Sequence, residues 1–306
     1  MSGLEGCGGK GAATAADAKS TADADPLALI PPSAIVVASI DAHAAFASAS
    51  IGATLTGVTD SLVPFGPETG FQASRDVDRI VLGVYTGGEA DAAAILSGRF
   101  DLDKINAATT AKNGAAIVKG TYAGFATETI GQVTIAPISA KTVVVGTGER
   151  VHRVLDRVTP PAGTTLQRSL PQWVSDTMGT QGAQFAVGAD FSSQPLAAAT
   201  IGSINLSWLK GLQIARAVGD FDAPGLNVAA TLTYGDPSGA QAASDGIHML
   251  DGLQKALAPL LLGAKVDNLQ VSSTANDVSC KFAVSDASLK ALWSLGSRYV
   301  LPQTGQ

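Results

Sequence analysis

Apolar runs of strand length, followed by apolar positions at helical spacing, define a basic unit over residues 77–112. Residues 77–85 and 92–100 each carry an apolar run typical of a strand. The glycine-rich segment 86–91 between them has the composition of a hairpin turn. Asp101 stands where the N-cap of a helix belongs, and apolar residues then recur at helical spacing. We therefore expect two strands and a helix here.

The rest of the first half places further elements around this unit. Residues 34–40 form a short apolar run that predicts a strand. Asp41 follows this run and is placed to cap a helix from Ala42 to about Leu55. After the unit, the sequence predicts four strands and a helix. They span residues 115–121, 125–130, 133–138, 142–145 and, for the helix, 150–158.

The second half repeats this order of elements. A predicted strand ending at Asp190 mirrors the strand that precedes Asp41, and an alanine-rich helix is expected over residues 196–204. Two strands, a long helix, two further strands and a last helix are expected after it. They span residues 212–221, 226–234, 239–262, 268–274, 278–284 and 287–295. The shared order predicts a tandem duplication.

These elements predict an α+β fold of two tandem similar units, each an antiparallel sheet covered by alanine-rich helices. Short turns between successive strands favour antiparallel pairing over a doubly wound topology. Prolines and glycine at 160–163 break the chain, so the first unit is expected over residues 27–160 and the second over 161–306. Residues 1–26 are low in complexity and predict a disordered tether.

Composition and charge exclude some classes of partner. Of 306 residues, 46% are hydrophobic and only 15% are charged. The net charge is −6 and Lys and Arg are scattered along the chain. Because binding to a phosphate backbone depends on concentrated positive charge, nucleic acid is not expected as a partner. No run of about eighteen apolar residues is present, so no transmembrane helix is predicted.

The chain lacks the sequence patterns of common catalytic, cofactor and metal sites. A zinc site needs three or four convergent ligands, and none of the three histidines pairs with another at helical spacing. They are His43, His152 and His248. The glycine-containing turn at 146–149 lacks the lysine of a phosphate-binding loop, and no nucleophile elbow is present. We therefore predict no catalytic, cofactor-binding or metal-ligating residues, and the sequence favours a non-catalytic protein over an enzyme.

The predicted helix at 150–158 is amphipathic. Its apolar side comprises Val151, Val154, Leu155 and Val158. Arg150, Arg153 and Arg157 lie along its other side. We interpret this cationic side as a solvated face. Contact with anionic lipid head groups is the alternative.

Cys280 lies within an alternating apolar strand pattern. Val278, Phe282 and Val284 share its face, while Ser279 and Lys281 lie on the other. Free cysteine at such a position acts as a small hydrophobic residue. We expect Cys280 to be buried packing, without a disulfide to Cys7.

Leu4-Glu5-Gly6-Cys7-Gly8-Gly9 resembles the lipobox of bacterial lipoproteins. Leu stands three positions before Cys, glycine directly before it and small residues after it. Glu5 departs from the small residue usual at its place, and the basic and apolar segments of a signal peptide do not precede the motif. The resemblance implies that Cys7 becomes the lipidated first residue of an exported protein and attaches it to a membrane. A free cysteine in a disordered tail is the alternative.

The opening of the folded part, Ile30-Pro31-Pro32-Ser33-Ala34 with an apolar strand before Asp41, is similar to exported lipoproteins of the periplasm and outer membrane of Gram-negative bacteria. This resemblance implies a cell-envelope location and no particular activity. Two functions remain open. One is a non-catalytic envelope lipoprotein that binds a protein partner or has a structural role. The other is a carrier of an apolar ligand or lipid held between sheet and helices, with the helix at 239–262 as one wall.

Overall fold

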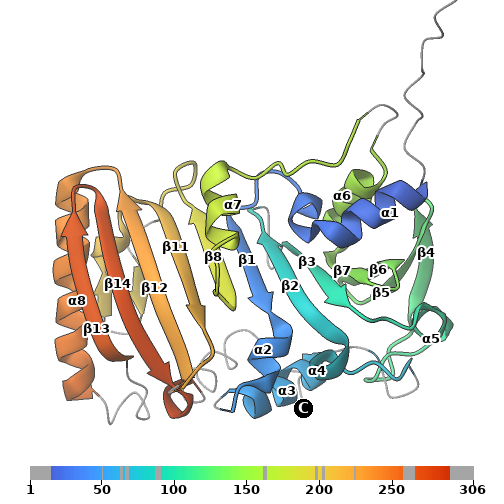
Figure 1. The fold of residues 1–306 in the computed structure, drawn as a ribbon, viewed down its shortest axis with the longest axis horizontal. Coiled ribbons are helices and arrows are strands. Elements are labelled where there is room, and N and C mark those ends of the chain that lie inside the picture. The colour runs from blue at the N-terminus through green and yellow to red at the C-terminus, as the bar shows by residue number, and fades with distance from the viewer. Residues whose placement is uncertain are drawn as a thin grey trace, which may run out of the picture.

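A computed structural model describes residues 15–49, 51–62, 65, 69–86, 91–160, 164–196, 199–201, 204–223, 225–257 and 266–289. These residues form one antiparallel sheet of 12 strands with helices packed on it, and a separate two-stranded hairpin (Figure 1). The α+β class expected from the sequence is therefore confirmed.

The large sheet is continuous from one end of the molecule to the other. Its strands are β1 (Val36–Asp41), β2 (Val77–Val84), β3 (Ala92–Gly98), β4 (Val118–Tyr122), β5 (Phe125–Ile130), β6 (Val133–Ser139), β7 (Thr142–Thr147), β8 (Phe185–Asp190), β11 (Leu212–Asp220), β12 (Gly225–Tyr234), β13 (Val266–Thr274) and β14 (Asp277–Ser285). They lie in the order β13-β14-β12-β11-β8-β1-β2-β3-β7-β6-β5-β4. The hairpin consists of β9 (Ala199–Ile201) and β10 (Ile204–Leu206).

The two halves of the chain meet in the middle of this sheet. β1 and β8 pair antiparallel, with Val36 opposite Ala189 and Ile40 opposite Phe185. The predicted units 27–160 and 161–306 therefore share one sheet, and a separate sheet for each unit is not found. The tandem duplication stays a prediction.

The helices follow several of the expected caps. They are α1 (Ala15–Ala24), α2 (Ala42–Ala47), α3 (Gly52–Leu62), α4 (Ala73–Asp76), α5 (Leu102–Ala107), α6 (Gly148–Val158), α7 (Gln172–Met178) and α8 (Pro237–Leu257), with 3-10 turns η1 (Pro26–Leu29) and η3 (Ser207–Leu209). Asp41 Oδ1 accepts a hydrogen bond from the Ala44 amide at 2.8 Å, and Asp101 Oδ1 accepts one from the Lys104 amide at 3.2 Å. Both carboxylates thus satisfy free N–H groups of a first turn, as predicted.

The prediction of a helix over residues 196–204 is wrong. Within this range, Ala199–Ile201 form strand β9 and Ile204 begins strand β10. Asp190, which ends the preceding strand, accepts a hydrogen bond from the Ser192 amide at 2.9 Å and closes a local turn. An aspartate after a strand supports either a helix cap or such a turn, so the residue type alone did not decide between them.

The prediction of a disordered tether over residues 1–26 is wrong for its last part, where Ala15–Ala24 form α1. α1 packs on the sheet, and Ala22 is fully buried. Asp23 Oδ1 accepts hydrogen bonds from the hydroxyls of Ser139 and Thr142, both at 2.6 Å. A low-complexity segment is therefore held by small buried side chains and by a carboxylate that bonds to the β6–β7 turn.

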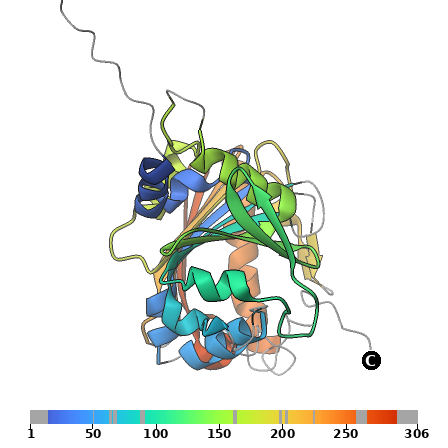
Figure 2. The same cartoon turned by 90° about the vertical axis from the view of Figure 1, so that its right-hand side faces the viewer.

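Helices lie on both faces of the sheet. We call the face that carries α1, η1, α6 and α7 the α6 face, and the opposite one the α8 face. In Figure 2, seen from the β4 end, α1 and α6 lie on one side of the curled sheet and α2 to α5 on the other. At the far end, α8 packs on β12, β13 and β14 from the α8 face.

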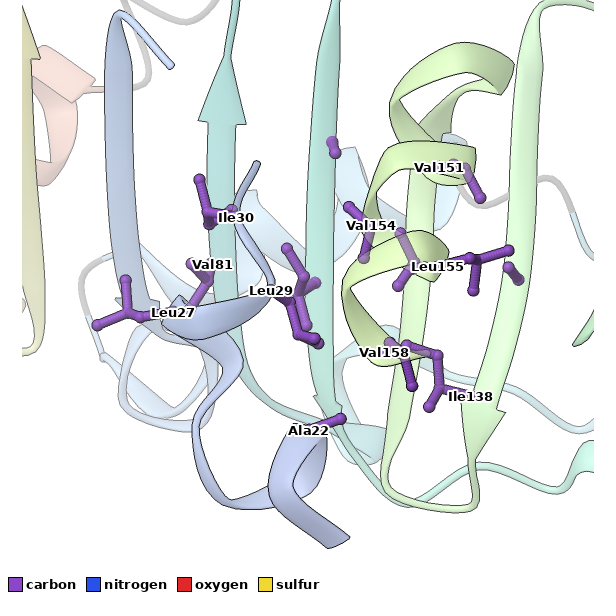
Figure 3. Packing of buried hydrophobic residues seen from close by; sticks show 14 of the residues in the cluster. Ala22, Leu27, Leu29, Ile30, Val81, Ile138, Val151, Val154, Leu155 and Val158 are labelled. Carbon is purple, nitrogen blue, oxygen red and sulfur yellow. The ribbon is translucent and has the colours of Figure 1, made fainter. Parts of the chain in front are cut away.

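The most extensive buried cluster lies on the α6 face. Figure 3 shows η1 and α6 side by side over the strands, with Leu29, Val154 and Leu155 between them. The apolar side of α6 is fully buried, or within 1% of it, at Val151, Val154, Leu155 and Val158. The predicted amphipathic helix is therefore confirmed. Burial of four such side chains stabilises this end of the sheet by several kcal/mol, since each contributes about 1.5–3 kcal/mol.

Candidate functional site

The residues that the sequence singled out do not converge on one site. Cys7 lies outside the described residues. Cys280 lies on β14 at the α8 face and is 6% exposed, and its neighbour Val278 is fully buried. Burial raises the pKa of the Cys280 thiol. The predicted strand register and the packing role of Cys280 are confirmed.

The three histidines lie apart from one another. His43 and His248 are exposed on α2 and α8. His152 stacks on Tyr122 with ring centroids 3.8 Å apart. Within the described ranges, no three His, Cys, Asp or Glu side chains come close enough together to hold a metal ion.

The arginines of α6 do not form a uniform solvated face. Arg150 forms bidentate hydrogen bonds to the carboxylate of Asp91, the shortest at 2.6 Å. The Arg150 and Asp91 side chains are only 12% and 16% exposed. The Arg150 guanidinium also lies over the Tyr85 ring, 4.2 Å from its centroid. Arg153 alone matches the solvated interpretation, since it forms an exposed ion pair with Glu149.

Arg157 likewise bonds inward to the chain that covers the sheet. Its Nε donates to the Ala28 carbonyl at 2.8 Å, and the Tyr85 hydroxyl donates to the Pro31 carbonyl at 3.1 Å. The hydrogen bond from Arg150 holds the pKa of Asp91 below its usual range. These contacts satisfy the groups involved, so we assign this cluster to holding η1 and α6 on the sheet.

A different region offers groups to a partner: the part of the α6 face formed by β11, β12, β14 and β13. α7 contacts β11 at the border of this region, and no described helix covers β12, β14 or β13 on that side (Figure 1). By the strand register, the side chains that share this surface are mostly polar. They include Arg216, Asp220, Asn227, Thr231, Ser279, Lys281, Gln270 and Ser272.

This surface is hollowed near the loop between α7 and β8. A depression of ≈ 460 Å³ lies between residues 180–183 and the strands. We call it the polar groove. Asp220, Asn227, Lys281 and Gln270 line it, together with Asn268, whose φ of +56° marks an irregularity in β13. The bulge turns the edge strand locally and shapes one wall.

The charges around the polar groove are only partly neutralised. Asp220 Oδ1 accepts hydrogen bonds from Asn227 Nδ2 at 2.7 Å and from the Asp222 amide at 3.1 Å. Lys281 and Arg216 form no ion pair within the described part of the chain. Nε of Arg216 is buried without a hydrogen-bond partner among those residues.

The groups that line the polar groove are suited to binding a partner through hydrogen bonds. Amide and hydroxyl groups beside Lys281 can donate hydrogen bonds to carboxylate and carbonyl oxygens of a partner. Sequence reasoning missed the groove because its residues come from three separate stretches of chain. The one available signal was the polar alternate positions of the strands at 212–234 and 268–284, and these mark a solvated face without showing that it is concave.

Comparisons with known proteins inform the fold. No family model and no curated protein matches the chain. Solved structures do match over most of its length. The chain is similar in fold to TP0453. Its crystal forms III and I superpose with TM-scores of 0.53 and 0.54 at 11% identity, covering 88% and 89% of this chain and 96% and 97% of TP0453.

Crystal form IV of TP0453 gives a TM-score of 0.50 at 12% identity, again covering 89% of this chain and 96% of TP0453. The likeness therefore spans both halves of the sheet rather than one unit. At this identity, the likeness to TP0453 shows the fold alone, and the site rests on the residues of this chain.

Proposed function

We propose that this chain is a non-catalytic lipoprotein of the cell envelope that binds a protein partner through the polar groove. On this proposal, a lipid on Cys7 attaches the chain to a membrane, and α1 begins the folded body after a short tether. The lipobox-like run before Cys7 supports the anchor. None of the described helices has the length and apolar content to cross a membrane.

The observation that carries the binding role is the open polar surface of β11 to β14. Elsewhere on the α6 face, helices and η1 cover the strands with apolar side chains. Here the strands present hydrogen-bonding groups around a depression that Lys281 lines, and Arg216 lies on the same face of β11 outside the depression. Neither cation belongs to a described ion pair. Unpaired cations beside amides favour a partner that carries carboxylates, such as an acidic protein segment.

Photo-crosslinking in cells tests this role. A photoreactive residue replacing the exposed Gln270 reports on the groove, and one replacing the exposed Gln241 on α8 is the matched control. We expect a discrete adduct from position 270 only, which Lys281→Glu removes because it reverses the charge. Equal adducts from both positions, or an adduct that survives Lys281→Glu, would contradict the proposal.

The anchor has a separate test. Cys7→Ser in the full-length gene should move the protein from the membrane fraction to the soluble fraction, because the acylated thiol is lost. If fractionation is unchanged, the proposal of a lipid on Cys7 is wrong. The crosslinking experiment tests the polar groove independently of this result.

The carrier function is a second candidate because two buried polar groups face the apolar cluster beneath α8. Tyr234 Oη and Trp208 Nε1 are buried without hydrogen-bond partners among the described residues. A ligand with a polar end and an apolar body would satisfy both. Native mass spectrometry of the purified protein separates the two functions, since a stoichiometric lipid mass supports the carrier.

The strand order also supports the proposed tandem duplication. Outward from the central pair, β1-β2-β3-β7-β6 in one half corresponds to β8-β11-β12-β14-β13 in the other. A long connection with a helix follows the third strand of each series, α5 in one half and α8 in the other. Superposing the two series on each other is the direct test, and opposite handedness of the connections would exclude a duplication.

A further inference from the structure

A buried carboxyl group lies near the β4 end of the sheet, far from the polar groove. Glu128 on β5 is 2% exposed, and neither of its carboxylate oxygens has a hydrogen-bond partner among the described residues. A buried carboxylate without partners is costly to ionise, because nothing replaces the water it loses. Burial raises the pKa of Glu128 to about 7.

One cation stands opposite this carboxyl group. Lys119 on β4 is the direct cross-strand neighbour of Glu128, so the two side chains leave the sheet on the same face. The Lys119 ammonium bonds elsewhere, to the Asn106 carbonyl of α5 at 2.6 Å. Its charge opposes the effect of burial on the pKa of Glu128. Lys119 therefore has two alternative acceptors.

Within the described part of the chain, Lys119 is the charged group that acts on Glu128, and the other elements near this face add no competing charge. Ile135 lies opposite it on β6 and is 1% exposed. On α5, Asp103 is exposed and Lys104 is engaged by Asp101 at 3.0 Å. Lys112, in the turn after α5, is exposed and already has an interaction of its own. Tyr122 belongs to the other face of β4, where it stacks on His152.

The position of β4 allows a change of partner. β4 is the last strand of the sheet and pairs only with β5 among the described strands. Its side chains are largely exposed, and Val118 is 65% exposed. A lysine side chain on such an edge strand can turn without disturbing a packed core.

We propose that Glu128 and Lys119 form a proton-controlled switch that fastens α5 to the edge of the sheet. While Glu128 carries its proton, Lys119 holds the Asn106 carbonyl. When Glu128 releases its proton to solvent, Lys119 turns to the carboxylate, and the C-terminal end of α5 loses this contact. The α5–β4 segment is thus more firmly held in mildly acidic than in mildly alkaline solution.

Carbon-13 NMR titration of the full chain tests the switch. The Glu128 carboxyl resonance should titrate near neutral pH, and the Asn106 carbonyl resonance should shift with the same midpoint. Glu128→Gln should abolish the Asn106 shift, because the amide stays neutral at every pH. Glu149→Gln is the matched control, since Glu149 is exposed, and it should leave both titrations unchanged.

Lys119→Met distinguishes the switch from simple burial. It should abolish the Asn106 shift and raise the Glu128 midpoint, because the favourable cation is gone. A Glu128 midpoint near the ordinary value for glutamate, or an Asn106 resonance that ignores the Glu128 titration, would overturn the proposal. The titration of the unmodified chain decides this even if a variant fails to fold.

Discussion

Cys280 and Glu128 are both buried, and burial raises the pKa of both side chains, but it is far more costly for the carboxyl group. A thiol loses little on leaving water, whereas the carboxyl group of Glu128 loses its hydration and has no hydrogen-bond partner among the described residues. The alternating pattern around Cys280 indicated its burial. Nothing in the run Phe125–Ile130 indicated that Glu128 faces inward, because Thr127 and Thr129 make the alternation ambiguous.

Replacing Cys280 should affect stability by packing alone. Cys280→Ala should lower the free energy of unfolding by about 1 kcal/mol, because it leaves a small cavity. Cys280→Asp should cost several kcal/mol, because its charge would be buried without a partner. Denaturant melts measure both, and native Cys280 should label slowly because its thiol is neutral and buried. Fast labelling would show an exposed thiol.

Glu128 should make stability fall as the pH rises. The pKa is about 7 in the folded chain against 4.5 for the free side chain, so the folded state holds the proton between these values and the unfolded state does not. Between pH 4.5 and 7 the free energy of unfolding should drop by about 3 kcal/mol relative to Glu128→Gln, and stay level outside this window. Denaturant melts across this range measure the difference. Parallel pH profiles of the two proteins would contradict the prediction.

At the scale of an element, α6 shows how a residue pattern underdetermines side-chain roles. Its apolar positions specify a buried side, and that side is observed. The arginines at 150, 153 and 157 look alike in the sequence, yet the first bonds to Asp91 and the last to the Ala28 carbonyl. Their partners come from segments more than 50 residues away, so only the folded chain brings them within reach.

The largely buried ion pair between Arg150 and Asp91 should contribute more to the free energy of unfolding than the exposed pair between Arg153 and Glu149. Arg150→Met should lower the free energy of unfolding by about 2–3 kcal/mol, because Asp91 would be left largely buried without its partner. Arg153→Met is the matched control and should cost less than about 0.5 kcal/mol, since its pair with Glu149 is exposed. Denaturant melts compare the two, and equal losses would show that burial of the pair does not matter.

Acid should remove the contribution of this pair. The pKa of Asp91 is lowered in the folded chain, so its contribution is present above the unfolded pKa and is lost as the pH falls through the folded pKa. The difference in unfolding free energy between the parent and Arg150→Met should therefore shrink in acid. A difference that grows in acid would contradict this assignment.

At the scale of the molecule, one sheet joins both halves through the pairing of β1 with β8. A single sheet transmits unfolding across its paired strands. We therefore expect hydrogen exchange under denaturant to open β3 and β12 in one cooperative transition, measured by mass spectrometry. Two separated transitions, one for each half, would show that the units are independent.

The sequence by itself determined the α+β class, most strands, the caps at Asp41 and Asp101 and the burial of Cys280, because these depend on local periodicity and on contacts within a few residues. Tertiary structure alone decided the single sheet, the ordering of α1, the hairpin in place of a helix after Asp190, the polar groove and the isolation of Glu128. Each of these depends on which distant strand becomes a neighbour. The energy of such a contact depends on both segments together, so the sequence pattern of one segment alone does not reveal it.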